Sequence, residues 1–398
     1  MTWLTAPLRK VAPSIAAQIA FSPDERVWQL SLDQIESETG EIVGKRYAAA
    51  SDAGTSTFYF DADNVLYSKL RPYLNKVAIP DEAGIATTEL IPLRPDPKTL
   101  NPRFLAYYLR SPGFVNQASH HVAGAKMPRV VMDWFWEHEA PIPAPKEQFR
   151  IVELLDEADR LRRLRREADA KAARILPALF LKMFGNPAKN PMGWALASFA
   201  NTFDDTTAGN EKLQSSQFME TGKIAVVDQG QSQISGYSDD VSIAYKGQLP
   251  VIVFGDHTRI FKFIDHPFVL GADGVRVLTP KPKFNPLFAY WHCKLLNIPS
   301  AGYSRHFKYL KEKSFICPDE DLQNRFSDLT QTVMSQTAVP EKAAAGVEQI
   351  FSVLLENAFS GQLTAQWREG HIQELLAEMT QQARALNLPM PRELEALS

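Results

Sequence analysis

The feature that most constrains this fold is that the second half of the chain repeats the first. Residues 143–151 (PAPKEQFRI) and 318–326 (PDEDLQNRF) share Pro, Gln and Arg at matching places, 175 positions apart. The same offset separates apolar pairs further along, Leu179 from Leu354 and Phe184 from Phe359. Upstream, Asn101-Pro102 returns 184 positions later as Asn285-Pro286. Self-similarity at a fixed offset marks repeated structural units, so we expect two copies of one unit.

Both copies are expected to have the same order of elements. Each opens on a β-rich region punctuated by Gly and Pro, continues through a short helical pattern and closes on a long one. This order predicts a mixed α/β chain with globular domains at 1–145 and 188–318, long helices at 146–187 and 319–362, and a helical tail at 363–398. The tail either packs against the N-terminal region and closes the repeat or docks a partner, and the sequence leaves both open.

The two long helices carry apolar residues at every seventh position, which is the pattern of a coiled coil. We therefore expect them to pair as an antiparallel coiled coil, with Pro340 breaking the second helix near Val339. The alternative is that each helix packs separately on its own domain. The positions expected at the coiled-coil or subunit interface are Ile151, Leu154, Leu161, Ile175, Phe326, Leu329, Val347 and Leu354.

Composition indicates a cytoplasmic globular protein. Of 398 residues, 45% are hydrophobic and 22% are charged, and the two cysteines lack metal-ligand spacing. We expect no leader and no membrane segment, because no basic stretch precedes an apolar core and no apolar run is long enough. The net charge of −3 disfavours a polyanion partner, but residues 255–313 contain ten Lys or Arg against four Asp or Glu. This local excess predicts a face that binds a polyanion.

Two basic segments that precede the long helices are candidate DNA contacts. Residues 302–313 interleave cations with aromatic rings, and residues 124–129 hold the corresponding place in the first half. Lys and Arg grip phosphates, while Arg, Lys, Asn and Gln read base edges. The alternative is a solvated basic helix start. The candidate residues here are Lys126, Arg129, Tyr303, Arg305, His306, Lys308 and Lys311.

A second pair of candidate segments follows strand-like runs and is expected in loops, where binding residues concentrate. Its residues are Lys69, Arg71, Lys76, His257, Arg259 and Lys262. The alternative is that these cations only protect strand edges from aggregation, and His257 could be a structural residue bonded to Asp256. The basic run at residues 160–166 is flanked by acidic residues, which favours a solvated or subunit-facing surface.

The sequence offers little support for chemistry in this chain. It lacks the Asn/Asp-Pro-Pro-aromatic motif of DNA adenine methyltransferases, and residues 40–46 fall one residue short of a phosphate-binding loop. Asp81, Asp96 and Lys98 fit loosely the pattern of a metal-dependent nuclease. Prolines on both sides of Asp96 disfavour the regular strand that such a site needs. We therefore expect no metal or cofactor here, and keep the nuclease as an alternative.

Two variable domains, each followed by a matched long helix, resemble the specificity subunits of type I restriction–modification enzymes. The resemblance covers nearly the whole chain. Its strongest parts are residues 142–152 (IPAPKEQFRIV), 254–259 (FGDHTR) with 271–274 (GADG), and 358–364 (AFSGQLT). It implies two α/β target-recognition domains, each of which reads one half of a split DNA sequence.

The resemblance also implies the partners. The helices would set the spacing between half-sites and dock methyltransferase subunits, two of them by analogy, which bring S-adenosylmethionine. Restriction subunits with motor and nuclease activity would join the complex, and this chain would be non-catalytic. A further alternative is a coiled-coil scaffold that does not bind DNA.

Overall fold

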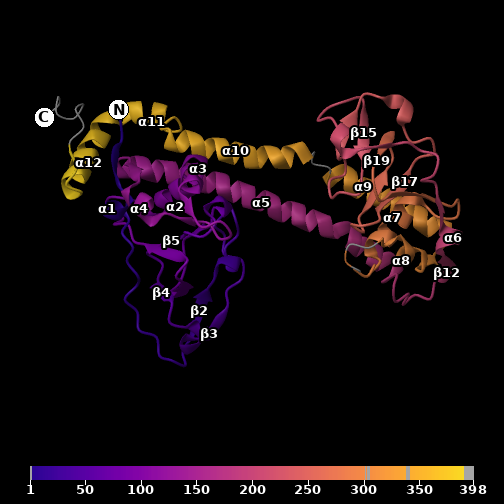
Figure 1. Cartoon of the computed structure of the whole chain (residues 1–398), viewed down its shortest axis with the longest axis horizontal. Helices are drawn as coiled ribbons and strands as arrows, with labels where there is room; N and C mark the ends of the chain where they lie inside the picture. The colour runs from indigo at the N-terminus through magenta and orange to yellow at the C-terminus, as the bar shows by residue number, and fades with distance from the viewer. Residues whose placement is uncertain (1, 301, 303–304, 338–340, 390–398) are drawn as a thin grey trace. The chain divides into compact units, whose positions relative to one another are not determined.

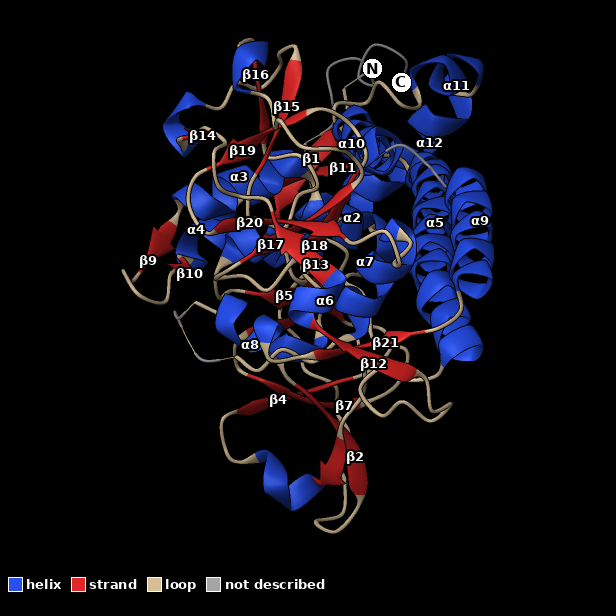
Figure 2. Ribbon diagram, turned by 90° about the vertical axis from the view of Figure 1, so that its right-hand side faces the viewer, coloured by secondary structure: helices blue, strands red, loops and turns tan. Residues whose placement is uncertain are grey.

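The contacts of the chain divide it into two compact units. The computed structural model describes residues 2–300, 302, 305–337 and 341–389. The first unit comprises residues 1–165 and 340–398, and the second unit comprises residues 166–339. Each unit mixes helices and strands, as the sequence predicts (Figure 1, Figure 2). Among the described residues, no helix combines the length and the apolar character needed to span a bilayer.

The first unit is built on a four-stranded and a three-stranded sheet. Their strand orders are β3-β2-β7-β4, with β2 and β7 parallel, and β6-β5-β8, which is antiparallel. A separate antiparallel pair joins β1 to β11. The strands are β1 (Leu4–Pro7), β2 (Arg26–Leu30), β3 (Tyr47–Ala49), β4 (Thr57–Phe60), β5 (Val65–Ser68), β6 (Val77–Ala78), β7 (Gly84–Thr87), β8 (Leu90–Leu93), β9 (Val122–Ala123), β10 (Arg129–Val130) and β11 (Glu139–Ile142).

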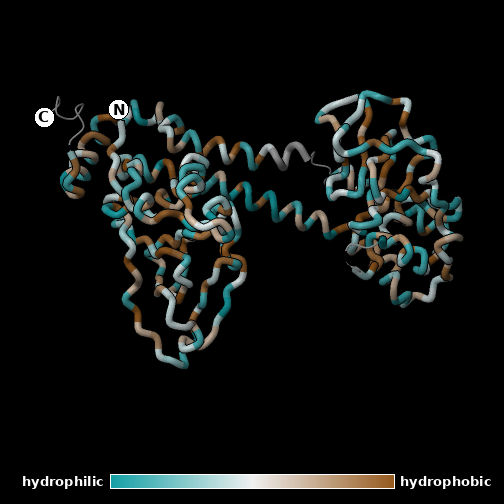
Figure 3. Tube along the Cα trace, in the orientation of Figure 1, coloured by the Kyte–Doolittle hydropathy of each residue, from teal (hydrophilic) through white to brown (hydrophobic). Residues whose placement is uncertain are grey.

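Helices cover the main core of the first unit, where β5 and β8 bury every residue. They are α1 (Leu8–Val11), α2 (Pro102–Arg110), α3 (Pro112–His120), α4 (Met132–Glu137), α10 (Glu341–Phe359), α11 (Ala365–Gly370) and α12 (Ile372–Ala385). The long helix α5 (Pro145–Phe184) begins in this unit and ends in the second. Hydrophobic and hydrophilic residues alternate along it (Figure 3).

The second unit contains two four-stranded sheets. Their orders are β13-β20-β17-β18, which is antiparallel, and β14-β19-β15-β16, in which β19 runs parallel to β14 and β15. A further pair joins β12 to β21. The elements are β12 (Ala195–Ser198), α6 (Phe199–Thr202), β13 (Phe203–Asp205), β14 (Lys212–Leu213), β15 (Ile224–Val227), β16 (Gly236–Ser238), β17 (Val251–Gly255), β18 (Phe261–Ile264), β19 (Phe268–Gly271), β20 (Val275–Pro280), α7 (Pro286–Leu295), α8 (Phe307–Lys311), β21 (Ser314–Cys317) and α9 (Glu320–Thr337).

A repeated glutamine explains why the sequence repeat is strongest at the start of the long helices. Gln148 is buried, donates through Nε2 to the carbonyls of Thr99 and Pro143, and accepts from the amide of Asn101. In the second unit Gln323 makes the same three bonds, to Lys283, Pro318 and Asn285. Each glutamine therefore ties a strand end and a helix start to the long helix, because its buried amide must be satisfied within the unit.

Matched asparagines begin the short helices of the repeat. The Asn101 side chain accepts from the amides of Arg103 and Phe104 at the start of α2, and Asn285 caps α7 in the same way. Proline occupies the first helical position in both, where its missing N–H costs nothing. The Asn-Pro pairs are thus helix starts, and their recurrence follows from this local structure.

Within each unit, α5 packs against a second helix of that unit. In the first unit the Arg162 guanidinium lies 4.0 Å from the Phe351 ring of α10. In the second unit the ring centroids of Phe180 and Phe326, the latter on α9, are 5.4 Å apart. The predicted second long helix corresponds to α9 in the second unit and α10 in the first. The predicted break at Val339 and Pro340 lies outside the described residues.

The predicted register of the helix interface needs a correction. Leu161, Ile175 and Leu329 were expected at the coiled-coil or subunit interface, but they are 54%, 44% and 40% exposed and do not lie in a seam between helices of this chain. The next residues along the chain, Arg162, Leu176 and Thr330, are buried in their place. Ile151 and Phe326 are fully buried, whereas Leu154, Val347 and Leu354 are half-buried.

The C-terminal tail packs against the N-terminal region, which is the first of the two alternatives. The buried Glu147 carboxylate accepts from Trp3 Nε1 at 2.9 Å, from Thr364 Oγ1 at 2.7 Å and from Arg368 Nε at 2.7 Å. On α12, Gln382 Nε2 donates to the Thr99 carbonyl at 2.6 Å. Three segments that are distant in sequence are therefore joined at one carboxylate.

Candidate nucleic-acid interface

In the first unit the structure brings two predicted basic segments together. The loop after β5 meets the segment at β10, where Leu70 and Arg129 form an antiparallel bridge. The Arg71 amide donates to the Pro128 carbonyl at 2.7 Å, and the Val130 amide to the Lys69 carbonyl at 2.9 Å. The resulting set, which we name the first basic surface, is Lys69, Arg71, Lys126 and Arg129.

These cations differ in solvent exposure and in whether an acidic residue already pairs with them. Arg71 and Lys126 are exposed, and Lys69 is half-buried. Arg129 forms a bidentate pair with Glu89, whose carboxylate lies 2.7 Å from Nη2, and this pair raises the pKa of Arg129. To bind a phosphate, Arg129 must break its ion pair with Glu89 or contact the phosphate and the Glu89 carboxylate together.

Lys76 does not join the first basic surface. Its Nζ donates to the Leu32 carbonyl at 2.6 Å, and its side chain is half-buried. The ammonium group is occupied within the unit, so we remove Lys76 from the candidate contacts.

In the second unit Asp256 and His306 join the two predicted segments. The buried Asp256 accepts from the Phe307 amide through Oδ1 at 2.7 Å. Its carbonyl accepts from the His306 amide and from His306 Nδ1, both at 2.9 Å. The turn after β17 is thereby fixed to the start of α8.

Two predicted contacts in this unit are corrected by their burial. His306 is 1% exposed, and its ring serves to hold the Asp256 turn. Lys262 is 2% exposed, with Nζ 3.5 Å from the Asp228 carboxylate, and burial lowers its pKa. Neither side chain reaches the surface that a phosphate would touch. Tyr303 lies outside the described residues.

The exposed cations of the two joined segments form the second basic surface, which comprises Arg259, Arg305, Lys308 and Lys311. Lys308 lies 4.8 Å from the Tyr309 ring, and Lys311 lies 4.8 Å from the Phe307 ring. Arg259 has a left-handed φ of 62° and donates through Nη1 to the Ile298 carbonyl at 3.1 Å. His257 is half-buried, and its amide donates to Gln229 Oε1.

The two basic surfaces are built on the same backbone frame. In the first unit the Lys69 amide donates to the Glu89 carbonyl, and the Lys69 carbonyl accepts from Val130. In the second unit the Asp256 amide donates to the Gly274 carbonyl, and the Asp256 carbonyl accepts from His306. In each unit these backbone bonds hold the loop after a buried strand, β5 or β17, beside a segment that precedes a long helix. The repeat therefore extends to the candidate site.

Sequence reasoning missed Glu89 and Gln229, which shape these surfaces. Glu89 holds Arg129, and the Gln229 carbonyl accepts from Thr258 Oγ1 at 2.6 Å. Both contact residues that are far from them in the chain. No local motif marks such contacts, so the sequence carries no signal for them.

The basic run on α5 is largely paired with acidic neighbours. Arg160 pairs with Glu157, and both Arg162 and Arg163 pair with Asp159. Arg162 is 4% exposed and also reaches Glu348 on α10. This pairing agrees with a solvated or packed helix surface and offers little free charge for phosphates.

The residues of the nuclease alternative have other partners. Lys45 Nζ lies 2.6 Å from the Asp81 carboxylate, and Asp96 Oδ1 accepts from the amide of Lys98 in its own turn. Across the described part of the chain, no group of three or more His, Cys, Asp or Glu side chains could hold a metal ion. The arrangement gives no support to a metal-dependent nuclease.

Comparisons with known proteins confirm the resemblance that the sequence indicates. Residues 52–171 match the family described as type I restriction modification DNA specificity domain. The type I restriction enzyme EcoDI specificity subunit of Escherichia coli is 24% identical over 159 residues, which cover 39% of this chain. The match spans only 35% of that relative's length. Both descriptions name a specificity domain or subunit, which does not support the nuclease alternative.

Solved structures share the fold over most of the chain. The type I restriction–modification S subunit of M. genitalium has a TM-score of 0.59 at 14% identity, covering 90% of this chain and 96% of that one. A chain from a study of complex assembly and conformational transition of the type I R-M system has a TM-score of 0.53 at 18% identity, with coverage of 91% and 98%. The likeness therefore concerns the fold of most of the chain.

Proposed function

We propose that this chain, which carries a type I restriction–modification DNA specificity domain, is the sequence-reading subunit of such a complex. Each unit would read one half of a bipartite DNA site, and the chain would have no catalytic chemistry of its own. The observation that carries the proposal is the frame that recurs in both units and presents a basic surface in each. Rigid linkage of two modest binding surfaces multiplies affinity when the half-sites are correctly spaced.

We further propose that the units are target-recognition domains joined by an antiparallel coiled coil. Contacts in the first unit support this direction. Glu147 near the start of α5 meets Thr364, whereas Arg162, further along α5, meets the earlier residue Glu348. Residue numbers therefore rise along α5 while those of its contact partners fall, which is the pattern of antiparallel segments. In the second unit the Phe180–Phe326 contact supplies a second stretch of pairing.

The partners we propose are two methyltransferase subunits, docked on equivalent grooves. In the first unit a groove runs between Asn101 and the α5 residues Val152 and Asp156. In the second unit a groove runs between Asn285 and the α9 residues Ser327 and Gln331, which follow the α5 pair by 175 positions. Phe149, 70% exposed, and Met334, 46% exposed, supply apolar contact area. Repeated grooves suit two copies of one partner.

The remaining roles would belong to those partners. The methyltransferase subunits would carry S-adenosylmethionine and methylate adenine, and restriction subunits with motor and nuclease activity would complete the complex. We propose that this chain acts in the cytoplasm on double-stranded DNA and itself holds no cofactor.

The direct test is genome-wide adenine methylation in cells that express the methyltransferase partner with and without this chain. We expect a split motif with a fixed gap that disappears without the chain. A methylation pattern that does not depend on the chain would contradict the proposal.

A further inference from the structure

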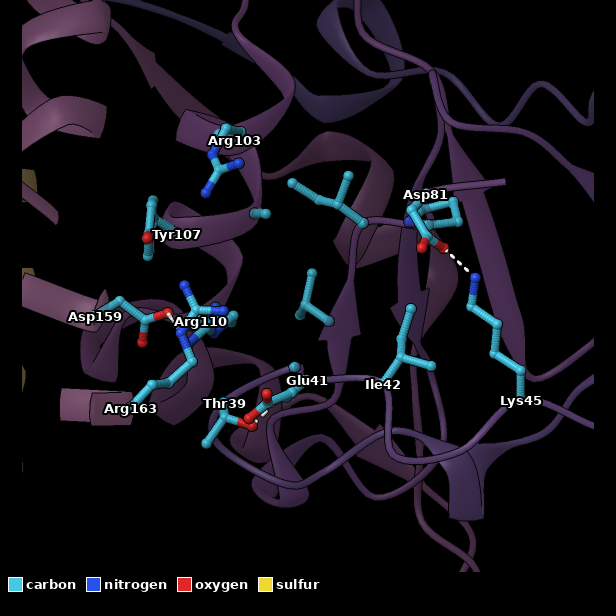
Figure 4. A pocket seen from close by; sticks show the side chains of 15 residues that line it. Thr39, Glu41, Ile42, Lys45, Asp81, Arg103, Tyr107, Arg110, Asp159 and Arg163 are labelled. Atoms are coloured by element: carbon cyan, nitrogen blue, oxygen red, sulfur yellow. Dashed lines mark hydrogen bonds and ion pairs between the residues drawn. The ribbon is translucent and has the colours of Figure 1, made fainter. Parts of the chain in front are cut away.

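The first unit contains a pocket that the DNA-reading role does not use. It has a volume of about 480 Å³ and lies among the 39–42 turn, the segment at 77–81, α2 and α5. Figure 4 shows Arg103, Tyr107 and Arg110 of α2 and Asp159 and Arg163 of α5 on one side, with Lys45 and Asp81 on the other. This size is within the range of small-ligand sites.

Arg110 is the unusual residue of this pocket. It is 8% exposed, although a guanidinium carries five N–H donors and is rarely buried unless it is paired. Its Nη2 donates to the Glu38 carbonyl at 3.2 Å, but its buried Nε has no partner among the described residues. Burial lowers the pKa of Arg110. The group is a buried cation that lacks a carboxylate of its own.

The other cations of the pocket have acidic partners. Arg103 pairs with Asp156, Lys45 with Asp81, and Arg163 lies 3.4 Å from Asp159. Asp159 also pairs with Arg162 and is therefore shared. Asp159 lies near Arg110 as well, so one carboxylate serves three arginines and the pocket wall carries an excess of positive charge. Glu41 also lines the pocket and opposes any anion there.

The second unit does not repeat this arrangement. The offset of 184 positions that relates α2 to α7 places Lys294 at the position of Arg110, and Lys294 is exposed. A buried arginine is therefore not required by the shared framework. It is a property of the first unit alone, which favours a role specific to this pocket.

We propose that this pocket binds the phosphate group of a small ligand through Arg110, with Arg163 as the second cation. A guanidinium is suited to bidentate recognition of a phosphate oxyanion. Bound phosphate supplies the counter-charge that a buried cation needs. The apolar wall formed by Ile42, Val77, Ile79 and the ring of Tyr107 accommodates the uncharged part of the ligand.

The test is thermal unfolding of the full chain in inorganic phosphate against sodium chloride of equal ionic strength. We expect phosphate to raise Tm by about 3 °C at tenfold its dissociation constant. Arg110→Gln should abolish this shift, and Glu41→Gln should increase it. Arg160→Gln is the control, because Arg160 is an exposed arginine of α5 that pairs with Glu157 outside the pocket.

Arg110 also donates to the Glu38 carbonyl, so the Arg110 variant could fail to fold. In that case the two separate variants Arg163→Gln and Glu41→Gln test the proposal. Loss of the phosphate shift in Arg163→Gln and its increase in Glu41→Gln support the proposal. No shift in the wild type beyond that in chloride, or equal shifts in all variants, overturns it. Displacement of phosphate by a DNA duplex of unrelated sequence would assign the phosphate to the DNA backbone and overturn the small-ligand proposal.

Discussion

Each basic surface presents exposed cations on a loop that a second segment holds in place. In the second unit the buried residues Asp256 and His306 supply this support, and Arg259, Arg305 and Lys308 remain exposed. A cation on a fixed loop loses little conformational freedom when it meets a phosphate. Each basic surface should therefore bind phosphates with cations that the folded protein already holds in position.

Removing two of these cations should change the salt dependence of DNA binding. We expect Arg305→Ala with Lys308→Ala to weaken binding and to lower the slope of log K against log salt by about 2, since each lost phosphate contact contributes about 0.9. Lys246→Ala is the control, because Lys246 is an exposed lysine of the same unit outside the surface. Fluorescence anisotropy of the complex on duplex DNA across a salt series measures the slope. An unchanged slope would remove these two residues from the interface.

Burial of His292 should make the second unit sensitive to acid. Burial lowers the pKa of His292 from 6.5 to about 3, and its Nε2 accepts from the Ile316 amide. The unfolded chain binds more protons between these values, so stability is full above pH 6.5 and falls by about 1.4 kcal/mol per unit below it. Urea unfolding of the wild type at pH 7 and pH 5 should show this loss. His292→Gln should reduce the difference and His120→Gln, at an exposed site, should not; equal differences in all three would refute the assignment.

The sequence identified the basic segments but not which of their cations are exposed to solvent. A run of Lys, Arg and His has the same composition whether a side chain meets solvent or a buried acid. Lys262 turns inward to Asp228 and His306 turns inward to Asp256, and both partners are far away in the chain. Such pairs depend on how strands cross, which no local pattern records.

At the scale of elements, the repeated glutamines connect the helices to the sheets. Their recurrence could be seen in the sequence, because Gln148 and Gln323 keep one offset. Their role could not, because their partners Thr99 and Lys283 are about 40 to 50 positions upstream. The helix register was wrong for a different reason. The buried stripe on α5 keeps the seven-residue spacing but lies one position further along, through Leu155, Arg162 and Leu176. Leu154 and Leu155 are both apolar, so the spacing alone does not decide which of the two tracks is buried.

Loss of either glutamine should destabilise its own unit. Gln323→Leu leaves two carbonyls and one amide without their partner, and we expect a loss of about 2 kcal/mol or more in the free energy of unfolding. Gln148→Leu should cost less, because Gln382 also donates to the Thr99 and Pro143 carbonyls and only the Asn101 amide loses its partner. Gln331→Leu is the matched control, because Gln331 is an exposed residue on α9. Urea unfolding measures the loss. A cost for Gln323→Leu no larger than that of the control would contradict the role of the glutamine.

At the scale of the whole molecule, the chain contains two copies of one unit, and the tail belongs to the first. Glu147 joins the N-terminal region, the long helix and the tail, so the first unit is completed by residues from both ends of the chain. The two-copy organisation and the α/β class could be predicted from the sequence. The sequence predicted a break near Pro340, where the two units divide, but not that α9 and α10 belong to different units, because their packing partners are far away in the chain.

The central claim is that each unit reads one half of a split site. The most direct measurement is genome-wide adenine methylation in cells that carry the partner methyltransferase with either of two variants of this chain. One is Arg71→Ala with Lys126→Ala, in the first basic surface, and the other is Arg259→Ala with Arg305→Ala, in the second. The account predicts that each variant weakens or relaxes one half of the motif, a different half in each case, with the gap unchanged. Equal relaxation of both halves by either variant, or a motif that neither variant alters, would contradict it.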